Sequence, residues 1–270
     1  MILFMLKKTF WDGWDNLLTM AVWNLVIIAS MIGGWFMLSA TVNVNVTSFV
    51  QTLPSYFALV AVLAFVNIFI FAVNKVTLKI SEWKGIKIID FFKAIPSVVL
   101  DGAVFGAFVA LLIIFLSVAF PFYYKMYRNG SMLGLFLLVF IFWTASITFL
   151  ALQWYMPLKV QMKGGFLKTL KKCYIIYFDN ANFSFFMFLY LIVQIIFSAI
   201  ALLFTIHGIA GITLAYNNAL RLRLFKYDWM EENPNLSPKE FKKVPWDELL
   251  AEEKNILGPR SLRSFFFPWT

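Results

Sequence analysis

The side chains that could perform chemistry are few and widely separated in this chain. It has one histidine, His207, and one cysteine, Cys173. A metal site needs several ligands close together and a nucleophile needs a neighbouring base, so neither residue predicts a metal site or a catalytic pair. We therefore expect no cofactor and no enzymatic activity. His207 is predicted to be a polar turn residue and Cys173 a small apolar filler.

Three aspartates recur along the chain at a spacing of about eighty residues. Asp15, Asp101 and Asp179 each stand beside a small or amide residue, where an apolar stretch begins. A tandem repeat would explain this spacing. So would the helix dipole, which favours an acidic residue in the first turn of any helix that enters the membrane. If the three carboxylates converged, they would be the only candidates for an enzyme that acts on a lipid or a lipid-linked sugar.

Uncharged amide side chains lie deeper in the apolar stretches. They are Asn24, Asn67, Gln153, Gln194 and Asn217. Such residues commonly bond across membrane helices, at about 0.6–2 kcal/mol each, and we expect that packing role for them. Ion-driven transport normally requires an ionisable side chain within a span, and none falls near a predicted span centre. A pathway lined by the amides stays open as the alternative.

The elements that position these residues are membrane helices. The composition is 61% hydrophobic and only 14% charged, which is far more apolar than a water-soluble fold of this size. A net charge of +9 could indicate nucleic-acid binding. The basic residues lie in membrane-flanking loops, however, so we expect anionic lipid headgroups as their partners and no nucleic acid.

The predicted fold class is all-α, a polytopic membrane protein with about six transmembrane helices in three hairpins and both termini cytoplasmic. The apolar stretches that predict the crossings are residues 17–40, 56–76, 102–122, 132–156 and 183–222, the last crossing twice with a turn near His207 and Gly208. Pro121 and Pro157 are expected to end the third and fourth helices. The N-terminal segment, residues 1–16, is predicted to lie flat on the inner leaflet.

Lysines crowd two of the connections between these stretches. Lys75, Lys79, Lys84, Lys87 and Lys93 fill the second, and Lys159, Lys163, Lys168, Lys171 and Lys172 fill the fourth. The first connection, residues 41–55, has no charged side chain. Because basic residues in short loops stay on the cytoplasmic side, both clusters are predicted to face the cytoplasm. Five crossings, the alternative, would leave Arg221 and the whole tail outside.

The tail differs in composition from the rest, which predicts a transmembrane domain over residues 1–225 and a cytoplasmic tail over 226–270. A capping box at Ser237–Glu240 and a start at Pro245 predict two short soluble helices, the second closed by Gly258. Aromatic residues that could bind a partner are Trp246, Phe265, Phe266, Phe267 and Trp269. The alternative is that the terminal aromatics fold back onto the membrane interface or this same chain.

The order of parts resembles the YesL-like family of bacterial membrane proteins over about residues 5–225. The likeness is carried by residues 10–17 (FWDGWDNL), 88–93 (IIDFFK), 156–158 (MPL) and 166–172 (FLKTLKK). The resemblance implies no catalytic residues. It implies an accessory or assembly role beside the permease of a carbohydrate-import ABC transporter in a bacterial inner membrane. A small-solute transporter or channel is the alternative function, and a lipid-directed enzyme the third.

Overall fold

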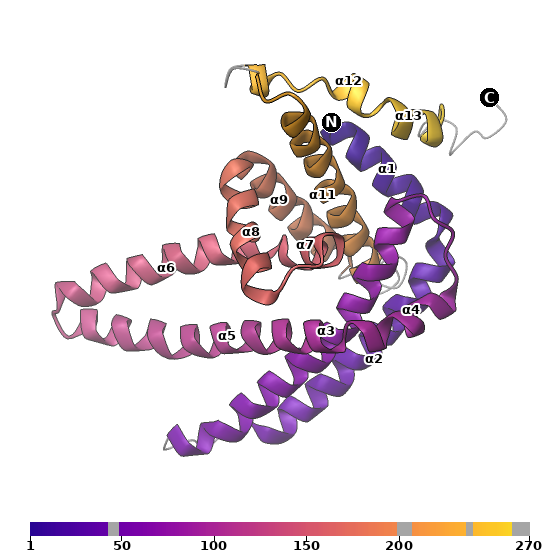
Figure 1. Cartoon of the computed structure of the whole chain (residues 1–270). Helices are drawn as coiled ribbons and strands as arrows, with labels where there is room; N and C mark the ends of the chain where they lie inside the picture. Colours follow the sequence, from indigo (N-terminus) through magenta and orange to yellow (C-terminus); the bar gives the residue numbers. More distant parts are fainter. Residues whose placement is uncertain (43–48, 199–206, 236–239, 261–270) are drawn as a thin grey trace.

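The computed structural model describes residues 1–42, 49–198, 207–235 and 240–260, and these residues form helices and no strand (Figure 1). The α-helices are α1 (Ile2–Asp15), α2 (Leu17–Thr41), α3 (Leu53–Ser81), α4 (Ile88–Ala94), α5 (Val99–Arg128), α6 (Met132–Leu152), α7 (Tyr155–Met162), α8 (Phe166–Asp179), α9 (Ala181–Ser198), α11 (Gly208–Glu232), α12 (Trp246–Leu249) and α13 (Ala251–Leu257). Short 3-10 helices are η1 (Phe49–Thr52), η2 (Ile95–Ser97) and η3 (Glu240–Lys242). The predicted all-helical class is confirmed.

Five described helices are long and apolar enough to cross a bilayer. They are α2, α3, α5, α6 and α9, with 18 to 30 residues each and mean hydropathy between 1.8 and 2.8 over their most apolar stretch. At about 1.5 Å per residue this length suits the hydrocarbon core. The chain is therefore a multi-pass membrane protein. Helix α11 is not among the five, since Arg221, Arg223 and Lys226 follow its short apolar first half.

Two long hairpins extend from a common body (Figure 1). In that view the α5–α6 hairpin runs to the left and the α2–α3 hairpin to the lower left, with their tips far apart. Near the body α3 and α5 pack closely. The two backbones approach so nearly that a Cβ added to Gly102 would lie only 2.6 Å from the Cα of Ile68.

Pro121 does not end the third helix as predicted, and α5 continues through it to Arg128. Pro157 does not end the fourth helix either, because α6 ends at Leu152 and Pro157 lies inside α7. Membrane helices tolerate proline when the freed backbone group finds another partner.

A short amphipathic helix precedes each pair of long helices. These are α1 before α2, α4 before α5, and α8 before α9. On α1 the polar Lys8 and Asp12 face inward and are buried, whereas Leu3 is 82% exposed. On α8 the buried residues include Thr169, whereas Leu167 is 75% exposed. This outward placement of apolar side chains suits contact with lipid at the membrane interface.

Helix α11 lies at the centre of the body and carries much of the core. Its residues Ala210, Leu214, Ala219 and Leu220 are fully buried. It packs against α1, α2, α3, α7 and α9. The apolar first half of α11 therefore meets protein on several sides, and few of its side chains are free to meet lipid.

The tail is joined to the membrane part more closely than the sequence predicted. Helix α11 runs through the predicted boundary at residues 225 and 226 to Glu232. The capping box falls on residues 236–239, which lie outside the described residues, and only η3 follows it. The second tail helix is divided into α12 and α13, and it ends at Gly258 as predicted. It is not wholly water-facing, because Leu250, Glu253 and Leu257 are buried.

Candidate functional site

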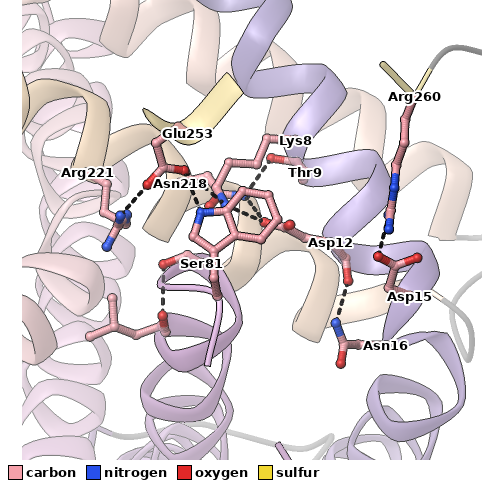
Figure 2. Close-up of polar contacts among 12 residues, drawn as sticks. Lys8, Thr9, Asp12, Asp15, Asn16, Ser81, Asn218, Arg221, Glu253 and Arg260 are labelled. Atoms are coloured by element: carbon pink, nitrogen blue, oxygen red, sulfur yellow. Dashed lines mark hydrogen bonds and ion pairs between the residues drawn. The ribbon is translucent and has the colours of Figure 1, made fainter. Parts of the chain in front are cut away.

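Charged side chains from three helices and an indole N–H from a fourth part of the chain meet in one buried cluster, which we call the ionic network. Its members are Lys8 and Asp12 of α1, Trp83 after α3, Asn218 and Arg221 of α11, and Glu253 of α13. Figure 2 shows Arg221 and Lys8 beside Glu253, and Asn218 beside Thr9 and Asp12. The first and last described α-helices are therefore held against each other and against α11.

Glu253 is the centre of the ionic network. Its Oε1 accepts a hydrogen bond from Arg221 at 2.6 Å, and its Oε2 accepts one from Nε1 of Trp83 at 2.9 Å. The Nζ of Lys8 lies 3.3 Å from the same Oε2. A carboxylate that is only 6% exposed requires such partners, because an unpaired buried charge is strongly destabilising.

Lys8 balances both acids of the network. Its Nζ lies 3.2 Å from Oδ2 of Asp12 and also stands 3.3 Å from the centroid of the Trp83 ring. Asn218 donates to Oδ2 of Asp12 and to the hydroxyl of Thr9, both at 3.1 Å. With Arg221, the network contains two cations and two anions, so its formal charges cancel. A neutral and buried arrangement suits a structural lock between helices.

Burial shifts the proton affinities of the α1 pair. It raises the pKa of Asp12 to about 6, although Lys8 and the Asn218 hydrogen bond oppose the shift. It also lowers the pKa of Lys8, against the attraction of the two carboxylates. The Asp12 carboxyl can thus change its charge within the ordinary pH range.

The three predicted helix-entrance acids do not form a common site. Asp15 pairs with Arg260, Asp101 lies 3.0 Å from Lys159, and Asp179 accepts a hydrogen bond from Tyr227 at 3.4 Å. Each pair joins the start of a long helix or its preceding segment to a different part of the chain. Over the part of the chain that the structure describes, no cluster of His, Cys, Asp and Glu could hold a metal ion.

The predicted packing amides take several roles. Asn24 accepts a hydrogen bond at 2.9 Å from the backbone N–H of Ala210, which joins α2 to the start of α11. Gln153, just after α6, donates to the Ser184 carbonyl of α9 and accepts from the Tyr216 hydroxyl of α11. Asn67 bonds within its own helix. Gln194 lines a cavity between α9 and α1.

Asn217 holds the most extensive of these connections. Its side-chain amide donates to the Asn74 carbonyl at 2.9 Å and to the Thr77 hydroxyl at 3.1 Å, both on α3. Its Oδ1 accepts a hydrogen bond at 3.1 Å from Gln161 of α7. Asn217, Asn74 and Thr77 are fully buried. The Asn74 amide nitrogen has no partner among the described residues, but the bonds that Asn217 makes to α3 and α7 fix how three helices cross.

Hydroxyl groups along the long helices bond to their own backbone. Ser30 of α2 and Ser117 of α5 donate to carbonyls three residues earlier, and Thr144 of α6 to one four residues earlier. These bonds satisfy the hydroxyls without a neighbouring helix. The polar groups named here are thus used in packing or in local bonding, with the exception of Gln194, which lines a cavity.

The remaining candidates have simpler surroundings. Cys173 of α8 is buried, and His207 immediately precedes α11. Trp246 opens α12 and lies 6.0 Å from the Arg223 guanidinium of the same chain. The other predicted partner-binding residues, Phe265, Phe266, Phe267 and Trp269, lie outside the described residues.

Sequence reasoning missed the ionic network. The only local signal was the spacing of Lys8 and Asp12, which places them on one face of a helix. Nothing near Glu253 in the sequence indicates that its carboxylate is buried against α1. The pairing depends on how α13 folds back, which is a long-range property.

No family model, curated protein or solved structure matches this chain. Its functional role therefore has to be inferred from its own contacts, charges and exposed surfaces.

Proposed function

We propose that this protein is a non-enzymatic accessory or assembly subunit of a membrane transporter. The partner is the permease of a carbohydrate ABC-type transporter, in a bacterial inner membrane. The partner's identity rests on the resemblance to the YesL-like family. The class of function rests on most of the polar groups named above, on the described spans and on α11, which bond to neighbouring helices or to their own backbone instead of lining a route.

In this proposal the chain crosses the membrane six times in three hairpins, with the lysine-rich side in the cytoplasm. Three contacts support the pairing of hairpin ends. Trp83 and Glu253 bring the second connection and the tail together. Asp101 at the start of α5 pairs with Lys159 of α7, the helix that follows α6. Asn180, before α9, donates to the Tyr227 hydroxyl on α11 at 2.7 Å. The start of α9 therefore lies beside the end of α11, and in this proposal α11 is the sixth crossing.

The α5–α6 hairpin is the proposed contact with an apolar helix of the permease. Helix α6 has only 11% of its most apolar stretch buried, against 39% for α3. An apolar groove of about 180 Å³ runs along the hairpin between residues that include Phe140 and Phe149. Large aromatic side chains often contribute much of the binding energy at a protein–protein interface. A two-helix arm also encloses no transport pathway of its own.

Purification from the native membrane in mild detergent, followed by mass spectrometry, tests this role. We expect a permease to co-purify with the tagged chain and to be lost when Phe140 and Phe149 are both changed to alanine. Phe57→Ala, which removes a 73% exposed ring from α3, is the matched control and should keep the partner. The proposal fails if no membrane protein co-purifies, or if the groove variant retains the same partner as the control.

The terminal aromatics give a second, separate measurement. Deleting residues 261–270 should weaken the same co-purification if these residues contribute to the partner contact. An unchanged yield would restrict the contact to the hairpin.

A small-solute transporter is the second candidate, because one cavity combines polar and apolar lining. It measures about 600 Å³ and is lined by Gln194, His207 and Tyr190 together with side chains of α1. Purified protein in liposomes should move no sugar or ion if the accessory role is correct. Solute uptake that Gln194→Leu abolishes would favour the transporter instead.

A further inference from the structure

A separate cavity of about 250 Å³, which we call the lysine pocket, lies where α3, the start of α5 and α7 meet. Its polar lining is formed by Lys75, Ser97, Asp101, Lys159 and Lys163. None of these residues belongs to the ionic network. The pocket is also distinct from the groove of the α5–α6 hairpin, which is apolar.

The charges of the lysine pocket do not cancel. Lys159 lies 3.0 Å from Asp101 and donates to the Gly164 carbonyl at 2.6 Å, so the single acid offsets this one lysine. Lys75 donates only to the neutral hydroxyl of Ser97, at 2.7 Å. The Lys163 ammonium group has no hydrogen bond or ion pair among the described residues, and only its backbone N–H is bonded, to the Lys159 carbonyl. Three lysines against one aspartate leave two positive charges, which favours an anionic ligand.

The pocket also retains free hydrogen-bond donors. An ammonium group can donate three hydrogen bonds, so Lys75 and Lys163 have several left for a ligand. The start of α5, which no side chain caps, also borders the pocket through Val98 and Asp101. Donors that approach from three elements suit a ligand with several acceptor oxygens on one centre.

The position of the pocket further limits the class of ligand that it can bind. It lies at the lysine-rich ends of the spans α3 and α5, beside the short amphipathic helix α4. Basic pockets between membrane helices at this level bind lipid headgroups. We propose that the lysine pocket binds a phosphate group, carried by an anionic phospholipid or by a soluble phosphorylated solute. This site is independent of the partner proposed above.

The experiment uses the full chain in nanodiscs of neutral phosphatidylcholine. The test variant is Lys75→Gln/Lys163→Gln, which leaves the Lys159–Asp101 pair intact. The matched control is Lys168→Gln/Lys171→Gln, which removes the same charge from exposed positions on α8. Equal thermal unfolding midpoints for the two variants establish that both are folded.

One arm adds phosphatidylglycerol and counts the retained phospholipid by native mass spectrometry. The other adds inorganic phosphate and measures its binding by equilibrium dialysis. We expect the test variant to bind the correct ligand about tenfold or more weakly than the control, because two charge-assisted contacts are lost.

Each result has a defined meaning. A selective loss in the phospholipid arm supports the proposal with a lipid as the source. A selective loss in the phosphate arm supports it with a soluble phosphate compound as the source. If the two variants behave alike in both arms, or if neither arm shows binding to the unaltered chain, the lysine pocket is not a phosphate site.

Discussion

The Nζ of Lys8 lies 3.3 Å from Oε2 of Glu253, so a buried ion pair joins the first described helix to the last (Figure 2). This contact makes the tail part of the membrane domain's packing. It also brings the tail to the connection after α3, because Trp83 donates to the same carboxylate oxygen. Several measurable consequences arise from this arrangement and from the helix contacts around it.

Glu253→Gln should destabilise the protein by about 3 kcal/mol or more, since it leaves the buried Lys8 and Arg221 with too little negative charge. Thermal unfolding in detergent measures the effect. Asp247→Asn is the control, because it removes the exposed Asp247–Lys254 pair from the same tail and should change little. Equal unfolding midpoints for the two variants would show that the ionic network does not hold the tail.

The stability of the unaltered chain should increase as the pH falls from 7 to 5. The pKa of Asp12 is about 6 in the folded protein and near 3.8 in an unfolded chain, so the folded state binds this proton more tightly. The stabilisation from Asp12 is therefore complete below about pH 3.8 and is lost as the pH rises through 6. The difference between these two pKa values limits the stabilisation to about 3 kcal/mol.

Asp12→Asn tests this assignment by thermal unfolding over the same pH range. It removes the titrating group while keeping the size of the side chain. The stability change between pH 5 and pH 7 should become smaller in this variant. If the stability of the variant depends on pH as that of the unaltered chain does, a group other than Asp12 causes the pH dependence.

Gly106→Ala should destabilise the α3–α5 contact by roughly 1–3 kcal/mol, because the added Cβ would overlap the backbone of Leu63 and Ala64. Gly33→Ala is the matched control in α2, where no atom lies within 4 Å of the added Cβ. Alanine is the better helix former, so the control should be neutral or slightly stabilising. Thermal unfolding midpoints of the two variants measure the difference in stability. Similar midpoints would contradict the close packing of α3 and α5.

Asn217→Ala should cost about 1–3 kcal/mol, because it removes hydrogen bonds to the buried Asn74 carbonyl and Thr77 hydroxyl and to the Gln161 amide. Ser117→Ala, which removes only a local bond to the Ile114 carbonyl, should have a smaller effect. Thermal unfolding in detergent compares the two. A larger loss for the serine variant would argue against the crossing of α3, α7 and α11 described above.

Single cysteines introduced at Lys84, Asn129 and Asn255, in a Cys173→Ser background, test the topology by labelling with a membrane-impermeant reagent. All three positions are exposed. Lys84 and Asn255 should be labelled from the same side, since Trp83 and Glu253 are in contact, and Asn129 from the opposite side. Labelling of Asn255 together with Asn129 would exclude the proposed even number of crossings.

Local sequence patterns predicted much of the helical framework. Hydropathy indicated α2, α3, α5, α6 and α9, because the need to cover a hydrocarbon core acts on each stretch separately. Amphipathic spacing indicated the short helix at residues 1–16. Gly258 was correctly expected to close the last helix of the tail. Pro121 was misread, since a proline's effect depends on whether its surroundings can satisfy the freed carbonyl.

The sequence by itself thus determined that this is a helical, multi-pass membrane protein with lysine-rich connections. Only the tertiary structure decided that Lys8 and Asp12 face inward, that Glu253 joins them, and that Asn217 holds three helices together. The physical reason is that membrane insertion depends on the hydropathy of neighbouring residues in one stretch. The partner of a buried charge or amide, by contrast, depends on which distant helices pack against it.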